Sequence, residues 1–182
     1  MEEKMKVIKY MVVLMLSLST VVLSKESVSK KTTTSKWSTL VGKELRNSKK
    51  EKKTVQDLSN KKIVGLYFSA HWCSPCRRFT PDLIRFYKDL AKAGESFEII
   101  FVSFDREVSE MDEYMRETGM PWLALPFGDA HKKTLGKIFS IRSIPSLIIL
   151  DGNGNLITKD GRKDVSQLGL AAYKKWQKEA KK

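Results

Sequence analysis

The chain has 182 residues, of which 41% are hydrophobic, so it is long enough to bury the core of one ordinary domain and global disorder is excluded. Two cysteines are too few for a disulfide scaffold or an all-cysteine zinc site. The formal charge of +13 raises the question of nucleic-acid binding. Residues 63–173, however, carry fourteen basic and fourteen acidic side chains, and the excess lies mainly at 25–62 and 174–182. Lysine runs with few aromatic residues are typical of solvated tails, so a nucleic-acid partner is not expected.

Residues 1–24 have the pattern of a secretory signal peptide. Three lysines precede an uncharged run at 11–24, which is shorter than the roughly 20 apolar residues that a membrane-spanning helix needs. Val22 and Ser24 occupy the −3 and −1 positions of a cleavage site before Lys25. An uncleaved anchor and an apolar helix packed on the domain are the alternatives. No stable membrane span is expected.

The signal peptide determines the expected compartment. A cleaved chain enters an oxidising compartment and is secreted or stays in the lumen of the endoplasmic reticulum. If translation starts downstream, or if the leader is not used, the protein is cytoplasmic.

A basic, polar linker is predicted at residues 25–36, because this segment has almost nothing apolar to bury. The folded domain is then expected at 37–182, ending in a lysine-rich helix. Residues 49–53 indicate an exposed turn between two short strands, the second at 54–58.

Hydrophobic periodicity in the remaining chain alternates between strand and helix. Apolar runs predict buried strands, and apolar residues spaced three and four apart predict helices. Helical connections between strands favour parallel pairing, whereas a closing hairpin adds antiparallel strands. The predicted fold is a three-layer α/β/α sandwich with a central mixed sheet. The predicted strands are 63–69, 97–103, 146–150 and 156–158, and the predicted helices are 79–90, 108–117, 134–139 and 168–182.

The pair Cys73 and Cys76 lies directly after the first predicted core strand, at the start of a helix. Free backbone N–H groups and the helix dipole stabilise a thiolate at Cys73, which makes it a nucleophile near neutral pH. Cys76, one turn further along, can attack a mixed disulfide formed at Cys73. Between them lie Ser74 and Pro75, and proline suits the first helical turn. Trp72 shields one side of the sulfur.

Three other interpretations of the cysteine pair remain open. The two cysteines can form a structural disulfide, be half of a zinc site with His71 and His131, or be an accidental pair in the core. The position between strand and helix favours the redox interpretation over these. No metal site is expected.

A proline immediately before the third predicted core strand supports the redox interpretation. Because proline is poorly tolerated inside a central strand, Pro145 is expected at the first residue of that strand. An ordinary trans loop proline is the alternative.

Four segments of the chain form a distinctive set of motifs. They are Trp72-Cys-Ser-Pro-Cys-Arg77 with Phe79-Thr-Pro81, Phe101-Val-Ser-Phe-Asp105, Met120-Pro-Trp-Leu-Ala-Leu-Pro126 and Ile141-Arg-Ser-Ile-Pro145. Together they resemble the tryparedoxins and nucleoredoxins, which have a thioredoxin-like fold, and the likeness extends from about residue 38 to 165. Serine at position 74 departs from this group, which usually has proline there, and Tyr67 stands where plain thioredoxins carry a buried aspartate.

The resemblance implies a dithiol–disulfide oxidoreductase in which Cys73 attacks and Cys76 resolves. It further implies that Trp72 and a cis-Pro145 border the site, that Trp122 lies nearby, and that the backbone of Ile144 faces an extended substrate strand.

The expected activity is reduction of protein disulfides by a monomer without a bound cofactor. The substrate is a disulfide-containing protein or a small thiol compound, and electrons come from a reductase or a low-molecular-weight thiol. Two alternatives are an oxidant or isomerase of the secretory pathway, and a non-enzymatic redox-sensing module with basic tails.

Overall fold

The computed structural model describes residues 36–58 and 60–181, so the predicted signal peptide at 1–24 and all but the last residue of the linker at 25–36 lie outside the described residues. Within the described part of the chain, no helix combines the length and apolar character needed to cross a membrane.

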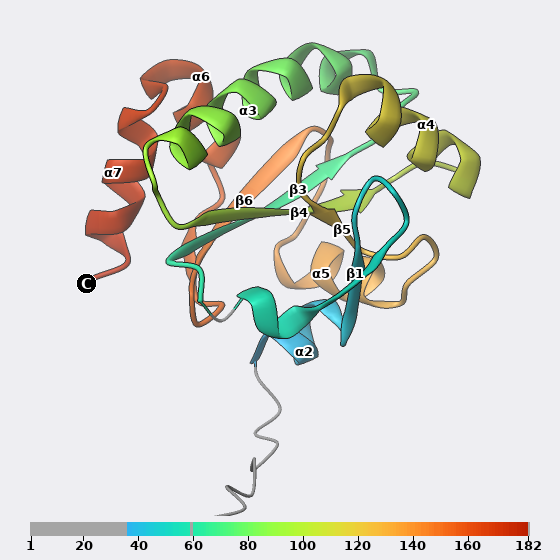
Figure 1. The fold of residues 1–182 in the computed structure, drawn as a ribbon, viewed down its shortest axis with the longest axis horizontal. Coiled ribbons are helices and arrows are strands. Elements are labelled where there is room, and N and C mark those ends of the chain that lie inside the picture. The colour runs from blue at the N-terminus through green and yellow to red at the C-terminus, as the bar shows by residue number, and fades with distance from the viewer. Residues whose placement is uncertain (1–35, 59, 182) are drawn as a thin grey trace, which may run out of the picture. The chain divides into compact units, whose positions relative to one another are not determined.

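A seven-stranded mixed sheet forms the middle of the fold, in the order β2-β1-β5-β4-β3-β6-β7 (Figure 1). The two central strands, β3 and β4, are parallel and buried along their whole length. On one side, β6 pairs antiparallel with β3, and β7 pairs antiparallel with β6. The strands are β1 Glu44–Arg46, β2 Lys52–Thr54, β3 Ile63–Ser69, β4 Phe97–Ser103, β5 Leu123–Ala124, β6 Ser146–Asp151 and β7 Leu156–Thr158.

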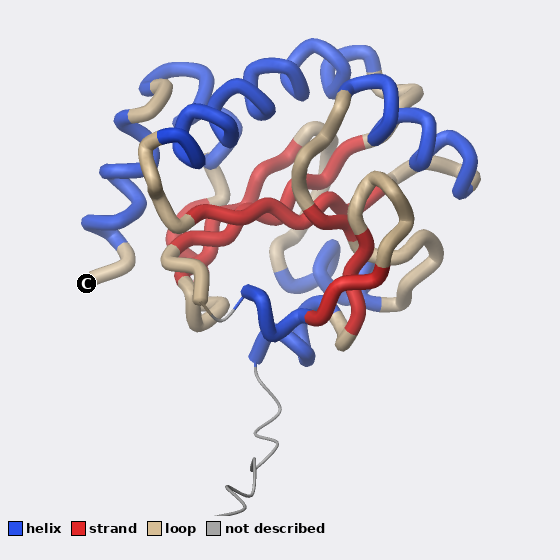
Figure 2. Tube along the Cα trace, in the orientation of Figure 1, coloured by secondary structure: helices blue, strands red, loops and turns tan. Residues whose placement is uncertain are grey.

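Helices cover both faces of the sheet, which makes three layers (Figure 2). Alternating side chains of β3 supply the two cores, with Tyr67 on one face and Leu66 and Phe68 on the other. The first face packs against α3 Ser74–Lys92, α4 Val108–Thr118, α6 Gly161–Leu168 and α7 Ala171–Glu179. The second packs against α2 Lys36–Val41, the 3-10 helix η1 Val55–Leu58 and α5 His131–Ile138. The predicted α/β/α sandwich is confirmed.

The predicted strands at 63–69, 97–103 and 156–158 match β3, β4 and β7 residue for residue. The predicted second short strand at 54–58 is wrong, because the strand is at Lys52–Thr54 and η1 follows it. Val55 and Leu58 are both buried, and their spacing of three suits a 3-10 turn better than a strand.

The terminal helix predicted at 168–182 is present as α7, but it spans only Ala171–Glu179. Leu168 instead ends the separate helix α6, which was not predicted, and Gly169 after it has a φ of 51° and a ψ of −135°, which are not helical. Leu168 and Leu170, on either side of Gly169, are exposed. Leu168 was expected in the buried apolar stripe of the last helix, but that stripe starts only at Ala172.

The ends of three strands lie together at one edge of the sheet. Because β3 and β4 are parallel, Ser69 and Ser103 end side by side, and the loop after Ser69 leads directly into α3. The antiparallel β6 begins at the same edge, since Ser146 pairs with Phe68. The loops before α3 and before β6 therefore meet there.

Candidate active site

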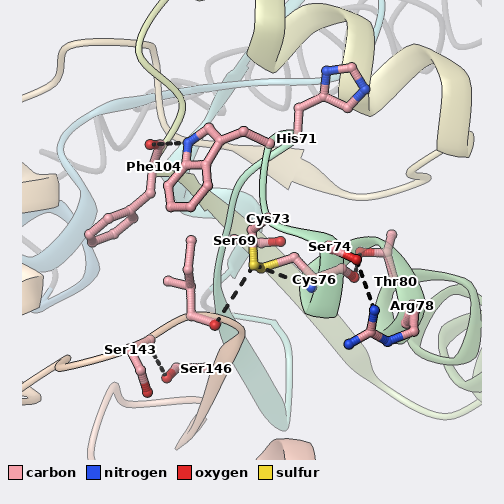
Figure 3. Close-up of a disulfide and its surroundings, with 12 residues drawn as sticks. Ser69, His71, Cys73, Ser74, Cys76, Arg78, Thr80, Phe104, Ser143 and Ser146 are labelled. Atoms are coloured by element: carbon pink, nitrogen blue, oxygen red, sulfur yellow. Dashed lines mark hydrogen bonds between the residues drawn. A yellow bond between two sulfur atoms is a disulfide. The ribbon is translucent and has the colours of Figure 1, made fainter.

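Cys73 and Cys76 form a disulfide at the N-terminal end of α3 (Figure 3). Cys73 is the residue that caps the helix, and its Sγ accepts a hydrogen bond from the backbone N–H of Cys76 at 3.3 Å. The two cysteines differ in solvent access, since Cys73 is 5% exposed and Cys76 is fully buried. Only the first sulfur can therefore meet a partner without rearrangement of the helix.

A hollow of about 500 Å³ lies beside Cys73. Trp72 forms part of its wall, and its indole Nε1 donates a hydrogen bond to the carbonyl oxygen of Phe104 at 3.2 Å. With 51% of its surface exposed, Trp72 leaves a large apolar ring available for contact. The lining residues are Trp72, Cys73, Ser74, Pro75, Phe104, Ile141, Arg142, Ser143 and Ile144, and Cys76 is not among them.

The loop before β6 closes the other side of this hollow. The Ile144–Pro145 peptide bond is cis, as the resemblance implies. The carbonyl oxygen of Ile144 lies 3.8 Å from Cys73 Sγ, although residues 73 and 144 are far apart in the sequence (Figure 3). Pro145, the next residue, is buried.

Trp122 is placed differently from the prediction that it lies near the site. It is 1% exposed and belongs to the hydrophobic core, where its ring packs edge-on against Tyr67 and Tyr87 at centroid distances of 6.2 and 5.6 Å. It does not line the hollow beside Cys73. Residues 123–124 join the sheet as β5, and this pairing directs the preceding tryptophan into the core.

Behind Cys76, a group of buried hydroxyls occupies the interior. The Thr80 Oγ1 donates to the carbonyl oxygen of Cys76 at 3.0 Å and lies 2.8 Å from the Tyr67 hydroxyl and 2.5 Å from the Tyr114 hydroxyl. The Tyr114 hydroxyl also contacts Ser69 Oγ at 3.1 Å. Burial raises the pKa of Tyr67 above its usual range. Tyr67, Thr80, Tyr114 and Ser69 thus form a connected group of buried hydroxyls behind Cys76.

A buried carboxylate anchors the loop that carries the cysteines. Asp105 accepts hydrogen bonds from the backbone N–H of His71 and from Ser103 Oγ, both at 2.7 Å. Burial raises the pKa of Asp105, and these hydrogen bonds oppose the shift. Asp105 is not among the site residues predicted from the sequence. Its position just after a buried strand, one that runs parallel to the strand before Cys73, is the feature that could have indicated it.

The two histidines lie apart from any metal-ligand arrangement. His71 Nε2 is 3.1 Å from Glu117 Oε2, and its ring stacks on Tyr114 at 5.6 Å. His131 Nδ1 instead lies 2.6 Å from Asp129 Oδ1. Within the described residues, no group of three or more His, Cys, Asp or Glu side chains could hold a metal ion.

Comparisons with known proteins agree with this geometry. A family model described as thioredoxin-like matches residues 60–156. Probable nucleoredoxin 1 of Arabidopsis thaliana is 49% identical over 119 residues, which is 65% of this chain but 20% of that protein. The match therefore spans about a fifth of this much longer relative.

Two solved structures match along nearly their whole length. Tryparedoxin from Trypanosoma brucei is 36% identical with a TM-score of 0.68, and the match covers 78% of this chain and 95% of that one. Thioredoxin from Wuchereria bancrofti is 38% identical with a TM-score of 0.65, and the match covers 75% and 95%. With its paired cysteines facing a cis proline, the chain belongs to the thioredoxin-like family, in the group of the tryparedoxins and nucleoredoxins.

Proposed function

We propose that this protein is a thiol–disulfide oxidoreductase that reduces disulfides in proteins, with Cys73 as the attacking thiol and Cys76 as the resolving thiol. The observation that carries the proposal is the unequal access of the two sulfurs. Cys73 lines the hollow and Cys76 is buried behind it.

The reaction begins with the reduced protein. The Cys73 thiolate attacks one sulfur of the substrate disulfide, which forms a mixed disulfide and releases the other substrate sulfur as a thiolate. Cys76 then loses its proton and attacks Cys73 Sγ, which releases the second substrate thiolate and forms the Cys73–Cys76 disulfide. The substrate gains two electrons and, once its thiolates are protonated, two protons. A dithiol or two thiols return the protein to its reduced form.

The helix terminus favours the charged form of the attacking thiol. The hydrogen bond from the Cys76 backbone N–H at 3.3 Å and the N-terminal end of the α3 dipole both stabilise negative charge on Cys73 Sγ. Arg77 and Arg78 lie near the N-terminal end of the same helix and add positive potential. The Arg78 guanidinium donates to Ser74 Oγ at 2.8 Å, one turn earlier in the helix.

The substrate chain binds in extended form beside Ile144. The main chain at this residue lies beyond the end of the β3–β6 pairing, which stops at Ser146. Its carbonyl oxygen points toward Cys73 Sγ (Figure 3), so a substrate segment that pairs with this loop presents its sulfur to Cys73. The exposed Trp72 ring covers the segment from the opposite wall of the hollow. No bound cofactor takes part, and a reductase or a low-molecular-weight thiol supplies the electrons.

Reduction of insulin disulfides in the presence of dithiothreitol tests the function. The wild-type protein is expected to accelerate precipitation of the insulin B chain well above the dithiothreitol background, and Cys73→Ser is expected to give the background rate. Equal rates for the two proteins would overturn the proposal.

We further propose that residues 1–24 are a cleaved signal peptide and that the mature protein works in the secretory pathway or outside the cell. The uncharged run and the cleavage-site residues support this proposal. N-terminal sequencing of the protein from its own cells is expected to start near Lys25. A start at Met1 or Met5 would contradict it.

A further inference from the structure

A second hollow adjoins the active-site hollow across the loop before β6. Its volume is about 410 Å³, and it shares Ser143 with the active-site hollow and includes Pro145 in its wall. It therefore lies next to the surface on which a substrate segment beside Ile144 would lie. Its lining also includes Leu147, Lys159, Asp160, Arg162 and Lys163.

Positive charge dominates this second hollow. Lys159, Arg162 and Lys163 are exposed, and Asp160 is the one carboxylate in the lining. Among the ion pairs of the described residues, none involves these three cations, so their charge is not compensated within 4.0 Å. Arg142, in the wall of the active-site hollow, is likewise exposed and absent from those ion pairs.

Close packing of α6 on β6 fixes these cations beside the loop. A side chain at Gly161 would bring its Cβ to 2.7 Å from both the Leu147 carbonyl oxygen and Ile149 Cγ1, so only glycine permits this approach. The next two residues, Arg162 and Lys163, are thereby held over the start of β6. The basic character is local, because residues 63–173 as a whole carry equal numbers of basic and acidic side chains.

We propose that the preferred substrates carry acidic residues next to the disulfide that is reduced. This inference rests on the proposed oxidoreductase function. An extended chain advances about 3.3 Å per residue, so a segment bound beside Ile144 reaches the second hollow within a few residues of its cysteine. Glutamate or aspartate at those positions meets Lys159, Arg162 and Lys163, while lysine or arginine is repelled. Complementary charge of this kind raises the association rate and selects among partners.

Three peptides that differ only in charge test the proposal. Each contains one disulfide in the same spacing, and the residues on both sides of each cysteine are all Glu, all Gln or all Lys. We expect the wild-type protein at low salt to reduce the Glu peptide with a kcat/KM roughly tenfold above that of the Lys peptide, with the Gln peptide between them. At 0.5 M salt the ratio is expected to fall to within about threefold.

Variants then assign the preference to the second hollow. The triple variant Lys159→Gln, Arg162→Gln, Lys163→Gln is expected to lower the Glu-to-Lys ratio to within about threefold and to leave reduction of the Gln peptide unchanged. A matched control, Lys88→Gln, Lys174→Gln, Lys178→Gln, removes three exposed charges outside both hollows and should keep the wild-type ratio.

Two results would overturn the inference while leaving the oxidoreductase function intact. One is equal kcat/KM for the three peptides with wild-type protein. The other is a full preference for the Glu peptide in the triple variant. Failure of the wild-type protein to reduce any of the peptides, or insulin, would instead overturn the proposed function and this inference with it.

Discussion

The Tyr67 hydroxyl lies 2.8 Å from the Thr80 Oγ1, which in turn donates to the carbonyl oxygen of Cys76. These contacts join the middle of β3 to the first turns of α3 in the buried region behind the disulfide. Since burial holds the pKa of Tyr67 above its ordinary value, this hydroxyl stays protonated through the neutral range. Its role is to hold the helix start, and it does not act as a base.

Substitution of Tyr67 by Phe separates these roles. The variant is expected to lose about 1 kcal/mol of unfolding free energy, because one buried hydrogen bond is removed. Its pH–rate profile for insulin reduction between pH 6 and 9 should keep the wild-type shape. Tyr173→Phe is the matched control, since that buried tyrosine donates to the Ser96 carbonyl away from the cysteines. Loss of an ionisation from the profile of Tyr67→Phe alone would contradict the account.

The two tryptophans of the motif segments are expected to behave in opposite ways. Trp72→Ala removes an exposed ring from the wall of the hollow, so it should lower kcat/KM for insulin severalfold and change the free energy of unfolding by less than about 0.5 kcal/mol. Trp122→Phe shrinks a buried ring and should cost about 1–3 kcal/mol, with kcat/KM of the folded protein unchanged. Urea unfolding and the insulin assay measure both effects. The reverse pattern would place Trp122 at the site after all.

Glu98 gives the protein a defined pH dependence of stability. Burial raises the pKa of Glu98, although it bonds to Tyr87 and to the Ile99 N–H. The folded protein therefore holds this proton to higher pH than the unfolded chain does. Stability from this group is lost as the pH rises from the unfolded pKa, about 4.3, through the folded one.

Replacement of Glu98 by Gln removes that titration. The unfolding free energy of Glu98→Gln minus that of wild type is expected to be more positive at pH 7.5 than at pH 4, as measured by urea unfolding at both pH values. Glu113→Gln, at an exposed position, serves as the control. Its difference in unfolding free energy from wild type should change less between the two pH values. A Glu98→Gln difference that is independent of pH, or that moves in the opposite direction, would refute the argument.

A buried carboxylate connects the last two helices. Asp164 in α6 accepts hydrogen bonds from Lys175 Nζ and Trp176 Nε1 in α7, both at 2.8 Å. Asp164→Ala leaves the buried indole N–H without this partner and is expected to cost about 2–3 kcal/mol in unfolding free energy. Lys175→Met removes only a partly exposed cation and should cost less than about 1 kcal/mol. Equal losses in the two variants would show that the ion pair, and not the buried indole contact, joins the helices.

The strands and the redox pair could be predicted because their signals are local. Continuous apolar runs bounded by polar residues mark β3 and β4, and the position between a strand and a helix marks the cysteine pair. The cis bond before Pro145 followed from the resemblance to a known family. None of these inferences required knowledge of long-range packing.

The elements that were missed depend on tertiary contacts. The break at Gly169 is invisible to a periodicity argument, because glycine is tolerated inside a helical pattern until packing selects a non-helical conformation. The two-residue β5 exists only through its neighbours, and its pairing carries Trp122 into the core. The cations of the second hollow come from residues that look like ordinary surface charges in the sequence.

Trapping of the mixed disulfide tests the central claim most directly. Each single-cysteine variant, Cys73→Ser and Cys76→Ser, is reacted with a disulfide peptide in the absence of other thiols and analysed by intact mass spectrometry. Cys76→Ser is expected to gain the mass of one peptide thiol, because Cys73 attacks and nothing resolves the product, whereas Cys73→Ser should remain unmodified because Cys76 is fully buried. Adduct formation on Cys73→Ser at a rate equal to that of Cys76→Ser would contradict the assignment of the attacking and resolving thiols.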